Sequence, residues 1–275
     1  MSHQGNDAVK VERGKMIVEN SDGTKTFVTE SGNFNNNAIV LLHGIGADHK
    51  MWEPQFQAFS KSGYYVLSPD LLGHGKSSKV NRLELRDWEN QITDLLQQKR
   101  LSQCNLIGVS MGGVIAQSFA MNHPEKVSKL VLSDTFGELK TFREKLLGFS
   151  QVLGFRVYKI LGSKMLAKGM VSAYKAPFAY RAKEYFSQVS LNVDFDQLIL
   201  ARKAINKIDT IGKIDGNQIP TMVIVGDQFG KMFIEVNRKI ANGIKGSKFV
   251  ILKNSMDPSN LVNPDDFNRE VLQFL

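Results

Sequence analysis

Residues 105–112 read NLIGVSMG, an apolar run that leads directly into a serine between two glycines. The run at 105–109 has the length and composition of a strand buried on both faces of a sheet. A helical pattern follows at 111–121, beginning at the residue after Ser110. Gly108, Ser110 and Gly112 therefore match the spacing Gly-x-Ser-x-Gly at a strand–helix junction, the context in which this motif presents a nucleophile.

The two glycines have a physical explanation. A serine lifted above a sheet needs a sharp, strained turn, and that turn leaves no space for side chains two positions on either side. The Ser110 hydroxyl then lies at a helix N-terminus, where the Met111 amide and the helix dipole can stabilise an oxyanion. We predict that Ser110 is a catalytic nucleophile and that Met111 supplies one donor of an oxyanion hole.

Strand and helix patterns alternate on both sides of this motif. Strands are predicted at 38–42, 64–68, 105–109, 127–133, 221–225 and 249–252. Helices are predicted at 53–60, 85–98, 111–121 and 234–241, and Asn263-Pro264 opens a last helix as its cap and first-turn proline. The segment 32–37 (GNFNNN) predicts a hairpin turn between two short strands. This alternation indicates the α/β class, with a doubly wound, mostly parallel sheet.

Residues 137–211 interrupt the alternation after the sixth core strand. They have helical patterns and no convincing strand. An insertion at this place lies near the carboxyl ends of the strands, where open α/β sheets bind their ligands. We therefore expect a core domain formed by 1–136 and 212–275, and a helical cap, or lid, formed by 137–211.

The charge of the 275-residue chain is concentrated in this insertion. The formal net charge of the chain is +8. Residues 137–208 hold 13 lysines and arginines against five acidic residues, so this segment accounts for the whole excess. The sequence has no zinc-finger spacing, no phosphate-binding Gly-Lys-Ser/Thr loop and no basic tail. We therefore expect no nucleic-acid partner, no metal and no cofactor.

The remaining bulk features favour a cytoplasmic protein. Residues 1–15 are polar and lack the apolar segment of a signal peptide, and no run of about 18 apolar residues could span a membrane. Cys104 is the single cysteine, so an intrachain disulfide cannot form. Its apolar strand context indicates a core residue.

Two further motifs follow predicted strands. His43-Gly44-Ile45-Gly46 follows the strand at 38–42, and residues 70–77 (DLLGHGKS) follow the strand at 64–68. With the serine motif and the closing helix, they make residues 14–275 resemble the α/β-hydrolase superfamily. The branch is that of capped esterases, C–C bond hydrolases, haloalkane dehalogenases and haloperoxidases. The resemblance implies that the Ile45 amide is the second oxyanion donor and that His43 and Gly44 are structural residues of the site.

The sequence departs from the family where the rest of a catalytic triad is expected. The family's acid ends a Gly-x-x-Asp turn after the strand that follows the cap. The matching turn here is 226–229, which ends in Phe229 and has Asp227 two residues earlier. The family's histidine lies seven residues before the proline of the last helix, and Asp257 occupies that position. The chain's histidines are His3, His43, His49, His74 and His123, and none of them follows residue 123.

A carboxylate at position 257 is a candidate replacement for the missing base. A serine hydroxyl is a poor nucleophile until a base takes its proton. An aspartate with an ordinary pKa is a weak base, but burial or a second carboxylate raises that pKa. We therefore consider Asp257 as the base and Asp227 as the second carboxylate. Asp134, where some relatives keep their acid, is interpreted as structural, and His123 as a residue of the outer surface.

Two classes of function stay open at this point. The first is a serine-dependent hydrolase of a small ester or other acyl substrate, in which Ser110 attacks and Asp257 takes the proton. The intact serine motif favours this class. The second is a ligand-binding or regulatory protein that keeps the pocket and has lost the triad, which Phe229 and Asp257 favour.

The composition of the insertion gives a separate expectation. Aromatic residues alternate with its lysines and arginines. One interpretation is that the aromatic residues pack on the core while the lysines face water. The alternatives are a pocket for an acyl or aromatic ligand with an anionic end, and peripheral contact with an anionic ligand or membrane surface.

Overall fold

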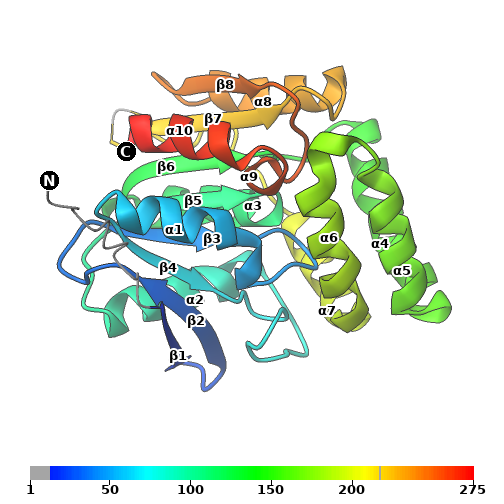
Figure 1. Ribbon diagram of the computed structural model, residues 1–275, viewed down its shortest axis with the longest axis horizontal. Helices are drawn as coiled ribbons and strands as arrows, with labels where there is room; N and C mark the ends of the chain where they lie inside the picture. The colour runs from blue at the N-terminus through cyan, green and yellow to red at the C-terminus, as the bar shows by residue number, and fades with distance from the viewer. Residues whose placement is uncertain (1–12, 217) are drawn as a thin grey trace, which may run out of the picture.

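The computed structural model describes residues 13–216 and 218–275 (Figure 1). His3 and the rest of the polar segment 1–12 lie outside the described residues. The described strands are β1 (Arg13–Glu19), β2 (Lys25–Ser31), β3 (Ala38–Leu42), β4 (Tyr65–Pro69), β5 (Cys104–Val109), β6 (Val127–Ser133), β7 (Thr221–Gly226) and β8 (Lys248–Leu252). The described α-helices outside the insertion are α1 (Glu53–Lys61), α2 (Leu85–Gln98), α3 (Met111–Asn122), α8 (Lys231–Asn242), α9 (Ser259–Val262) and α10 (Pro264–Phe274).

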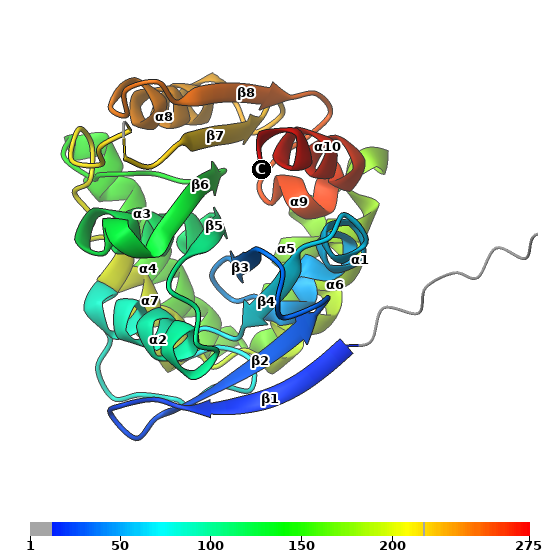
Figure 2. The same cartoon turned by 90° about the vertical axis from the view of Figure 1, so that its left-hand side faces the viewer.

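The strands form one twisted sheet in the order β1-β2-β4-β3-β5-β6-β7-β8 (Figure 2). Neighbours from β4 to β8 pair in parallel, whereas β1 and β2 are antiparallel to their neighbours at one edge. This order confirms the predicted doubly wound, mostly parallel sheet. All six predicted strands are present, with ends within one residue of the prediction.

The predicted hairpin turn at 32–37 is wrong. This segment joins β2 to β3, but those strands do not pair, because β4 lies between them in the sheet. The antiparallel hairpin is formed instead by β1 and β2. Its turn is closed by a hydrogen bond from the Asn20 amide to the Thr24 carbonyl, at 2.8 Å.

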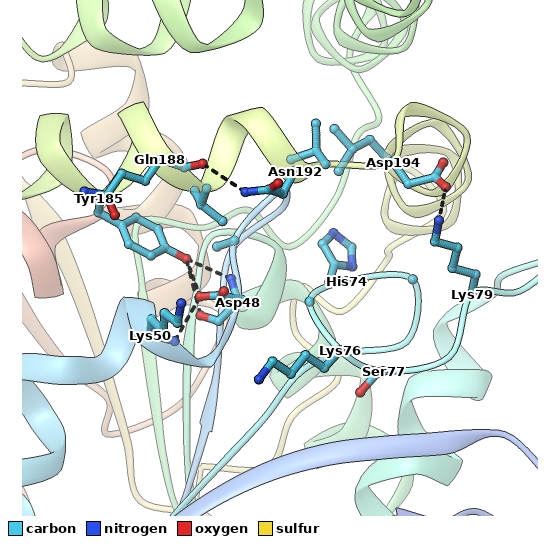
Figure 3. Close-up of a pocket in the computed structure, with 17 residues that line it drawn as sticks. Asp48, Lys50, His74, Lys76, Ser77, Lys79, Tyr185, Gln188, Asn192 and Asp194 are labelled. Carbon is cyan, nitrogen blue, oxygen red and sulfur yellow. Dashed lines mark hydrogen bonds and ion pairs between the residues drawn. The ribbon is translucent and has the colours of Figure 1, made fainter. Parts of the chain in front are cut away.

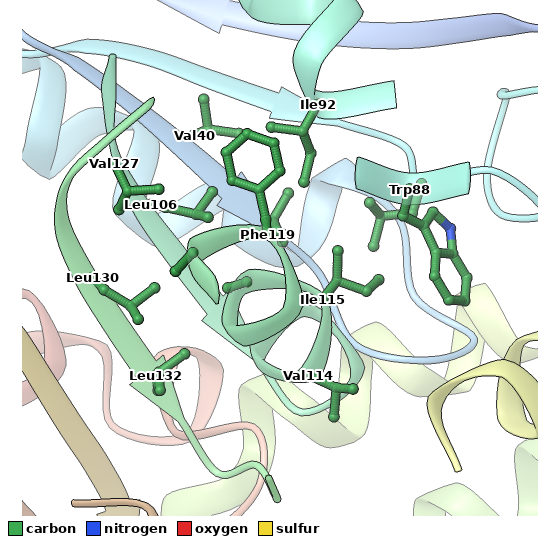
Figure 4. Packing of buried hydrophobic residues seen from close by; sticks show 14 of the residues in the cluster. Val40, Trp88, Ile92, Leu106, Val114, Ile115, Phe119, Val127, Leu130 and Leu132 are labelled. Carbon is green, nitrogen blue, oxygen red and sulfur yellow. The ribbon is translucent and has the colours of Figure 1, made fainter. Parts of the chain in front are cut away.

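Helices cover both faces of the central strands. In β3, Val40 and Leu42 belong to the cluster packed by α2 and α3, whereas Ile39 and Leu41 belong to the cluster packed by α1 and α10. All four side chains are fully buried. Figure 4 shows side chains of the first cluster, among them Val40 of β3, Ile92 of α2 and Phe119 of α3. Burial on both faces explains why these strands read as continuous apolar runs.

Four α-helices lie between β6 and β7: α4 (Phe142–Leu161), α5 (Ser163–Ala173), α6 (Tyr180–Val189) and α7 (Phe195–Ile205). Figure 1 shows them side by side at one end of the sheet, beyond the end of β6. The chain enters and leaves this insertion through a paired stem. The Thr210 amide donates to the Gly137 carbonyl at 2.9 Å, and Glu138 and Asp209 form an isolated antiparallel bridge.

The division into a core domain and a cap domain stays a prediction. Among the described helices, none is long and apolar enough to cross a membrane.

Candidate active site

Ser110 occupies the turn between β5 and α3. Its backbone has φ 54° and ψ −116°, a left-handed conformation that costs a non-glycine residue on the order of 1–3 kcal/mol. Two hydrogen bonds hold this turn: the Ser110 amide donates to the Ser133 carbonyl at 2.9 Å, and the Thr135 hydroxyl donates to the Ser110 carbonyl at 2.8 Å. The serine remains partly exposed. The fold thus holds a strained serine where solvent can reach it.

Both glycines of the serine motif are required by close backbone approach. A Cβ atom at Gly108 would lie 2.2 Å from the Gly112 carbonyl oxygen, and one at Gly112 would lie 2.0 Å from the Leu42 carbonyl oxygen. Neither backbone contact can be relieved by a side-chain rotation. At Gly44, the Cβ position lies 3.5 Å from the Ser110 Cβ, so the loop after β3 runs directly beside the serine.

The amides of Met111 and Ile45 lie on the two segments that flank Ser110. Met111 is buried and is the first residue of α3, where an amide has no acceptor within its own helix. Ile45 is half-buried in the loop after β3. Neither amide has a hydrogen-bond acceptor among residues 13–216 and 218–275. The two donors are therefore available to a ligand.

Asp257 lies at the serine. Its carboxyl group interacts electrostatically with the Ser110 side chain and with the Asp134 carboxyl group. Burial raises the pKa of Asp257 well above its ordinary value, and the neighbouring Asp134 charge raises it further, whereas the interaction with Ser110 opposes the rise. The structure thus places the predicted nucleophile and the predicted base close enough to interact electrostatically.

Asp134 follows β6 and completes a pair of buried carboxyl groups. Its Oδ1 accepts from the Gly226 amide at 3.0 Å, and its Oδ2 accepts from the Ser259 amide at 2.8 Å and from the Ser133 hydroxyl at 3.0 Å. Burial raises the pKa of Asp134, and these hydrogen bonds oppose the rise. Because its anion is better stabilised, Asp134 ionises first, and Asp257 keeps its proton to a higher pH.

The second carboxyl group at the site is therefore that of Asp134 and not that of Asp227. The Asp227 carboxylate accepts from the Gln228 side chain at 3.0 Å and from the Ser255 amide at 3.4 Å, and it lies 3.9 Å from the Lys253 ammonium. These contacts hold the turn after β7. The position of Asp134 after the sixth strand was the only sequence signal for its role.

Phe229 ends the same turn, and its side chain is not buried at the site. It is 45% exposed, and its ring packs against Phe233 with centroids 4.6 Å apart. The aromatic side chain therefore does not take over the function of the family's acid.

His43 is held inside the core. Its Nε2 accepts from the Leu71 amide at 3.0 Å, and its Nδ1 donates to the Gly44 carbonyl at 2.8 Å. An accepting Nε2 requires the neutral ring with the proton on Nδ1. Burial lowers the pKa of His43, which agrees with this form. The imidazole positions the loop that carries Gly44 and Ile45.

The other described histidines are also engaged away from Ser110. His49 Nδ1 lies 2.8 Å from the buried Asp70 carboxylate, and His123 lies 3.8 Å from Glu89. Burial lowers the pKa of His74 to about 3. Among the described histidines, none is hydrogen-bonded to Ser110, so an imidazole base is absent from this part of the chain.

Tyr174 connects the insertion to the loop that carries Asp257. Its hydroxyl, at the end of α5, donates to the Asp257 backbone carbonyl at 3.0 Å. Its ring stacks on Phe186 of α6, with centroids 5.3 Å apart and an interplanar angle of 4°. The helices of the insertion therefore help to position Asp257.

A cavity of about 300 Å³ lies beside the site, between the insertion and the loops after β3 and β4 (Figure 3). It begins at Gly46, the residue after Ile45, and extends to His74 and to Tyr185 on α6; Ser110 is not among its lining residues. His74 Nδ1 lies 3.3 Å from the Leu72 carbonyl, and its Nε2 has no partner among the described residues. Because Nε2 is itself fully buried, this acceptor is not accessible from the cavity in the structure.

The described residues contain no group of three or more His, Cys, Asp or Glu side chains placed to hold a metal ion. The expected absence of a cofactor stays a prediction.

Comparisons with known proteins agree with the fold described above. A family model described as alpha/beta hydrolase fold matches residues 37–264. A putative 2-succinyl-6-hydroxy-2,4-cyclohexadiene-1-carboxylate synthase of Bacillus subtilis is 27% identical, over 95% of this chain and 98% of the relative. Lipase 1 of Psychrobacter immobilis is 28% identical, over 80% of this chain and 72% of the relative. The crystal structure of the enol-lactonase from Burkholderia xenovorans is similar with a TM-score of 0.81 and 22% identity, covering 94% and 99% of the two chains.

Proposed function

This chain belongs to the alpha/beta hydrolase fold family, and from that premise we propose that it hydrolyses a small ester or related acyl substrate through Ser110. The observation that carries the proposal is the strained, partly exposed Ser110 at the N-terminus of α3, whose side chain interacts with the Asp257 carboxyl group. The relatives named hydrolases, lipases and esterases support the same reaction class.

In the acylation step, the Ser110 oxygen attacks the substrate carbonyl carbon while its proton passes to the Asp257 carboxylate. The carbonyl oxygen becomes an oxyanion, which the Ile45 and Met111 amides hold at the N-terminus of α3. The tetrahedral intermediate then collapses. The bond to the leaving group breaks, and the departing alkoxide takes the proton from Asp257.

Deacylation repeats these steps with water. A water molecule gives a proton to Asp257 as it attacks the acyl-enzyme carbonyl, and the same two amides hold the second oxyanion. Ser110 then leaves with the proton from Asp257. Each half-reaction returns Asp257 to its ionised form, so one carboxyl group serves as both base and acid.

Asp134 makes this assignment chemically workable. A carboxylate with an ordinary pKa accepts a serine proton poorly, whereas a raised pKa improves it as a base. The pKa of Asp257 is raised by burial and by the charge of Asp134. An imidazole remains the better base at neutral pH, so we expect rates orders of magnitude below those of a complete triad.

The cavity beside Gly46 is the proposed place for the part of the substrate that does not react. It lies next to the loop that offers the Ile45 amide.

Hydrolysis of p-nitrophenyl acetate tests the proposal. We expect slow turnover by the natural chain and none above the background rate with Ser110→Ala. Asp257→Asn keeps the shape of the side chain and removes the base, and it should lower the Ser110-dependent rate by roughly 10²–10⁴-fold. Equal rates for the natural chain and Ser110→Ala would show that the serine does no chemistry.

One observation favours the second class, a ligand-binding or regulatory protein. All four described histidines are engaged away from Ser110, so this part of the chain has no imidazole base. Under this alternative, the cavity binds a ligand with unchanged affinity in Ser110→Ala, and no ester is turned over.

A further inference from the structure

The outer side of α4 carries a continuous row of exposed apolar side chains. Successive members are three or four residues apart, so they lie on one face of the helix. We call them the α4 apolar face: Phe142 (80% exposed), Leu146 (53%), Phe149 (61%), Leu153 (49%), Val157 (45%) and Ile160 (87%). The side toward the rest of the molecule holds the buried residues of the helix, Gly148 and Val152.

Such a row is unusual on a protein surface. Single exposed apolar residues are ordinary, whereas a contiguous apolar surface marks an interaction site. The helix has 20 residues and is therefore about 30 Å long. Figure 1 shows α4 as an outer helix of the insertion, far from the sheet.

A basic groove adjoins the α4 apolar face. Lys145 and Arg156 of α4 and Lys203 of α7 line this groove, which has a volume of about 360 Å³, and Phe149 belongs both to the groove and to the apolar face. These three cations have no acidic partner in the described part of the chain. Lys159, by contrast, is paired with Asp196 at 2.6 Å. The groove therefore offers uncompensated positive charge.

We propose that the α4 apolar face and the basic groove dock on the surface of an anionic lipid bilayer, with α4 lying in the plane of the interface. The apolar side chains enter the boundary between headgroups and acyl chains, and the cations contact phosphate groups at the same depth. The +8 charge of residues 137–208 adds a longer-range attraction to an anionic surface.

The charge of the groove favours an anionic bilayer over a second copy of the chain as the partner of this surface. In a symmetric dimer through α4, the same surface of both copies would meet, and the unpaired Lys145, Arg156 and Lys203 of each would approach those of the other. Like charges across an interface disfavour association. An anionic surface neutralises them. The docking is independent of any role of Ser110.

Co-sedimentation with vesicles tests this surface. We expect the natural chain to bind vesicles of phosphatidylcholine and phosphatidylglycerol, and not vesicles of phosphatidylcholine alone. Lys145→Glu/Arg156→Glu/Lys203→Glu should weaken binding by at least about tenfold, because each basic residue at the surface contributes to the attraction. Phe142→Ser/Phe149→Ser should also weaken it by about tenfold or more.

Two matched controls separate this surface from general charge and hydrophobicity. Lys61→Glu/Lys231→Glu/Lys245→Glu makes the same change in net charge at exposed positions outside the insertion. Phe34→Ser removes an exposed phenylalanine, 71% accessible, from the loop after β2. Both controls should bind anionic vesicles as the natural chain does, and circular dichroism should show that all variants fold.

Three outcomes would overturn the proposal. The first is absence of binding by the natural chain. The second is equal loss in the groove variant and its charge control. The third concerns a second copy of the chain. The proposal would be wrong if the natural chain formed a dimer in sedimentation velocity, did not bind vesicles, and became a monomer in Phe142→Ser/Phe149→Ser.

Discussion

At the scale of single residues, the site depends on two carboxyl groups that share one buried space. The pKa values of Asp134 and Asp257 are both raised by burial, and the Asp134 charge raises that of Asp257 further. The folded chain therefore binds more protons than the unfolded chain at a pH above about 4, the ordinary range for aspartate. The two protonated carboxyl groups therefore contribute fully to the free energy of unfolding below that pH. This contribution is lost as the pH rises through their raised pKa values.

This sign gives a prediction for stability. Asp257→Asn removes one ionisation and most of the mutual repulsion. The variant should therefore have a higher free energy of unfolding than the natural chain at about pH 8, by about 1.4 kcal/mol for each unit of raised pKa that it abolishes. Near pH 4 the difference should shrink, because the Asp257 carboxyl group of the natural chain is then protonated. Urea unfolding at the two pH values measures it.

The exposed carboxyl group of Asp265 provides the control. Asp265→Asn should leave the pH dependence of stability as it is in the natural chain. If Asp257→Asn were less stable than the natural chain by the same amount at both pH values, the two carboxyl groups would not be electrostatically coupled.

At the scale of elements, the strands of the parallel sheet and the turn at Ser110 were the most predictable parts of the molecule. Strands buried on both faces must be apolar throughout, and the serine motif needs its glycines, so both left clear patterns. The hairpin at 32–37 was predicted wrongly because local turn chemistry does not tell which strand will lie between two others. The pairing of β2 with β4 depends on the whole sheet order.

Two glycines in helices test this account of the elements. Gly112→Ala places a Cβ 2.0 Å from the Leu42 carbonyl oxygen and should destabilise the fold by about 1–3 kcal/mol or more. Gly154 lies within α4 with no atom near its Cβ position, so Gly154→Ala should stabilise it by about 0.5–1 kcal/mol. Urea unfolding compares the two variants. Equal stability of Gly112→Ala and the natural chain would mean that the turn has more space than the structure gives it.

At the scale of the whole molecule, the sheet brings together residues that the sequence keeps apart. Asp134 follows β6, Asp257 follows β8, and Ser110 follows β5. The positions of Ser110 and Asp257 could be predicted by resemblance to a family. The pairing of Asp257 with Asp134 instead of Asp227 could not, because it depends on side-chain directions at the ends of three strands.

The exposed row on α4 was equally hidden from the sequence. Aromatic and aliphatic residues at helical spacing are most often buried, and only the position of α4 at the outside of the insertion shows that this face has no partner among the described residues. The concentration of positive charge in the insertion was visible from composition alone.

The pH dependence of covalent labelling at Ser110 tests most directly whether Asp257 activates the serine. A fluorophosphonate reacts with an activated serine, and intact-mass spectrometry follows its addition from about pH 5 to about pH 9. In the natural chain, the labelling rate should rise with pH through the raised pKa of Asp257 and then level off, because the ionised carboxylate is the active form. Asp257→Asn should react slowly with no such rise, and Ser110→Ala should not react. Labelling of Asp257→Asn at the natural rate and with the same pH profile would contradict the account.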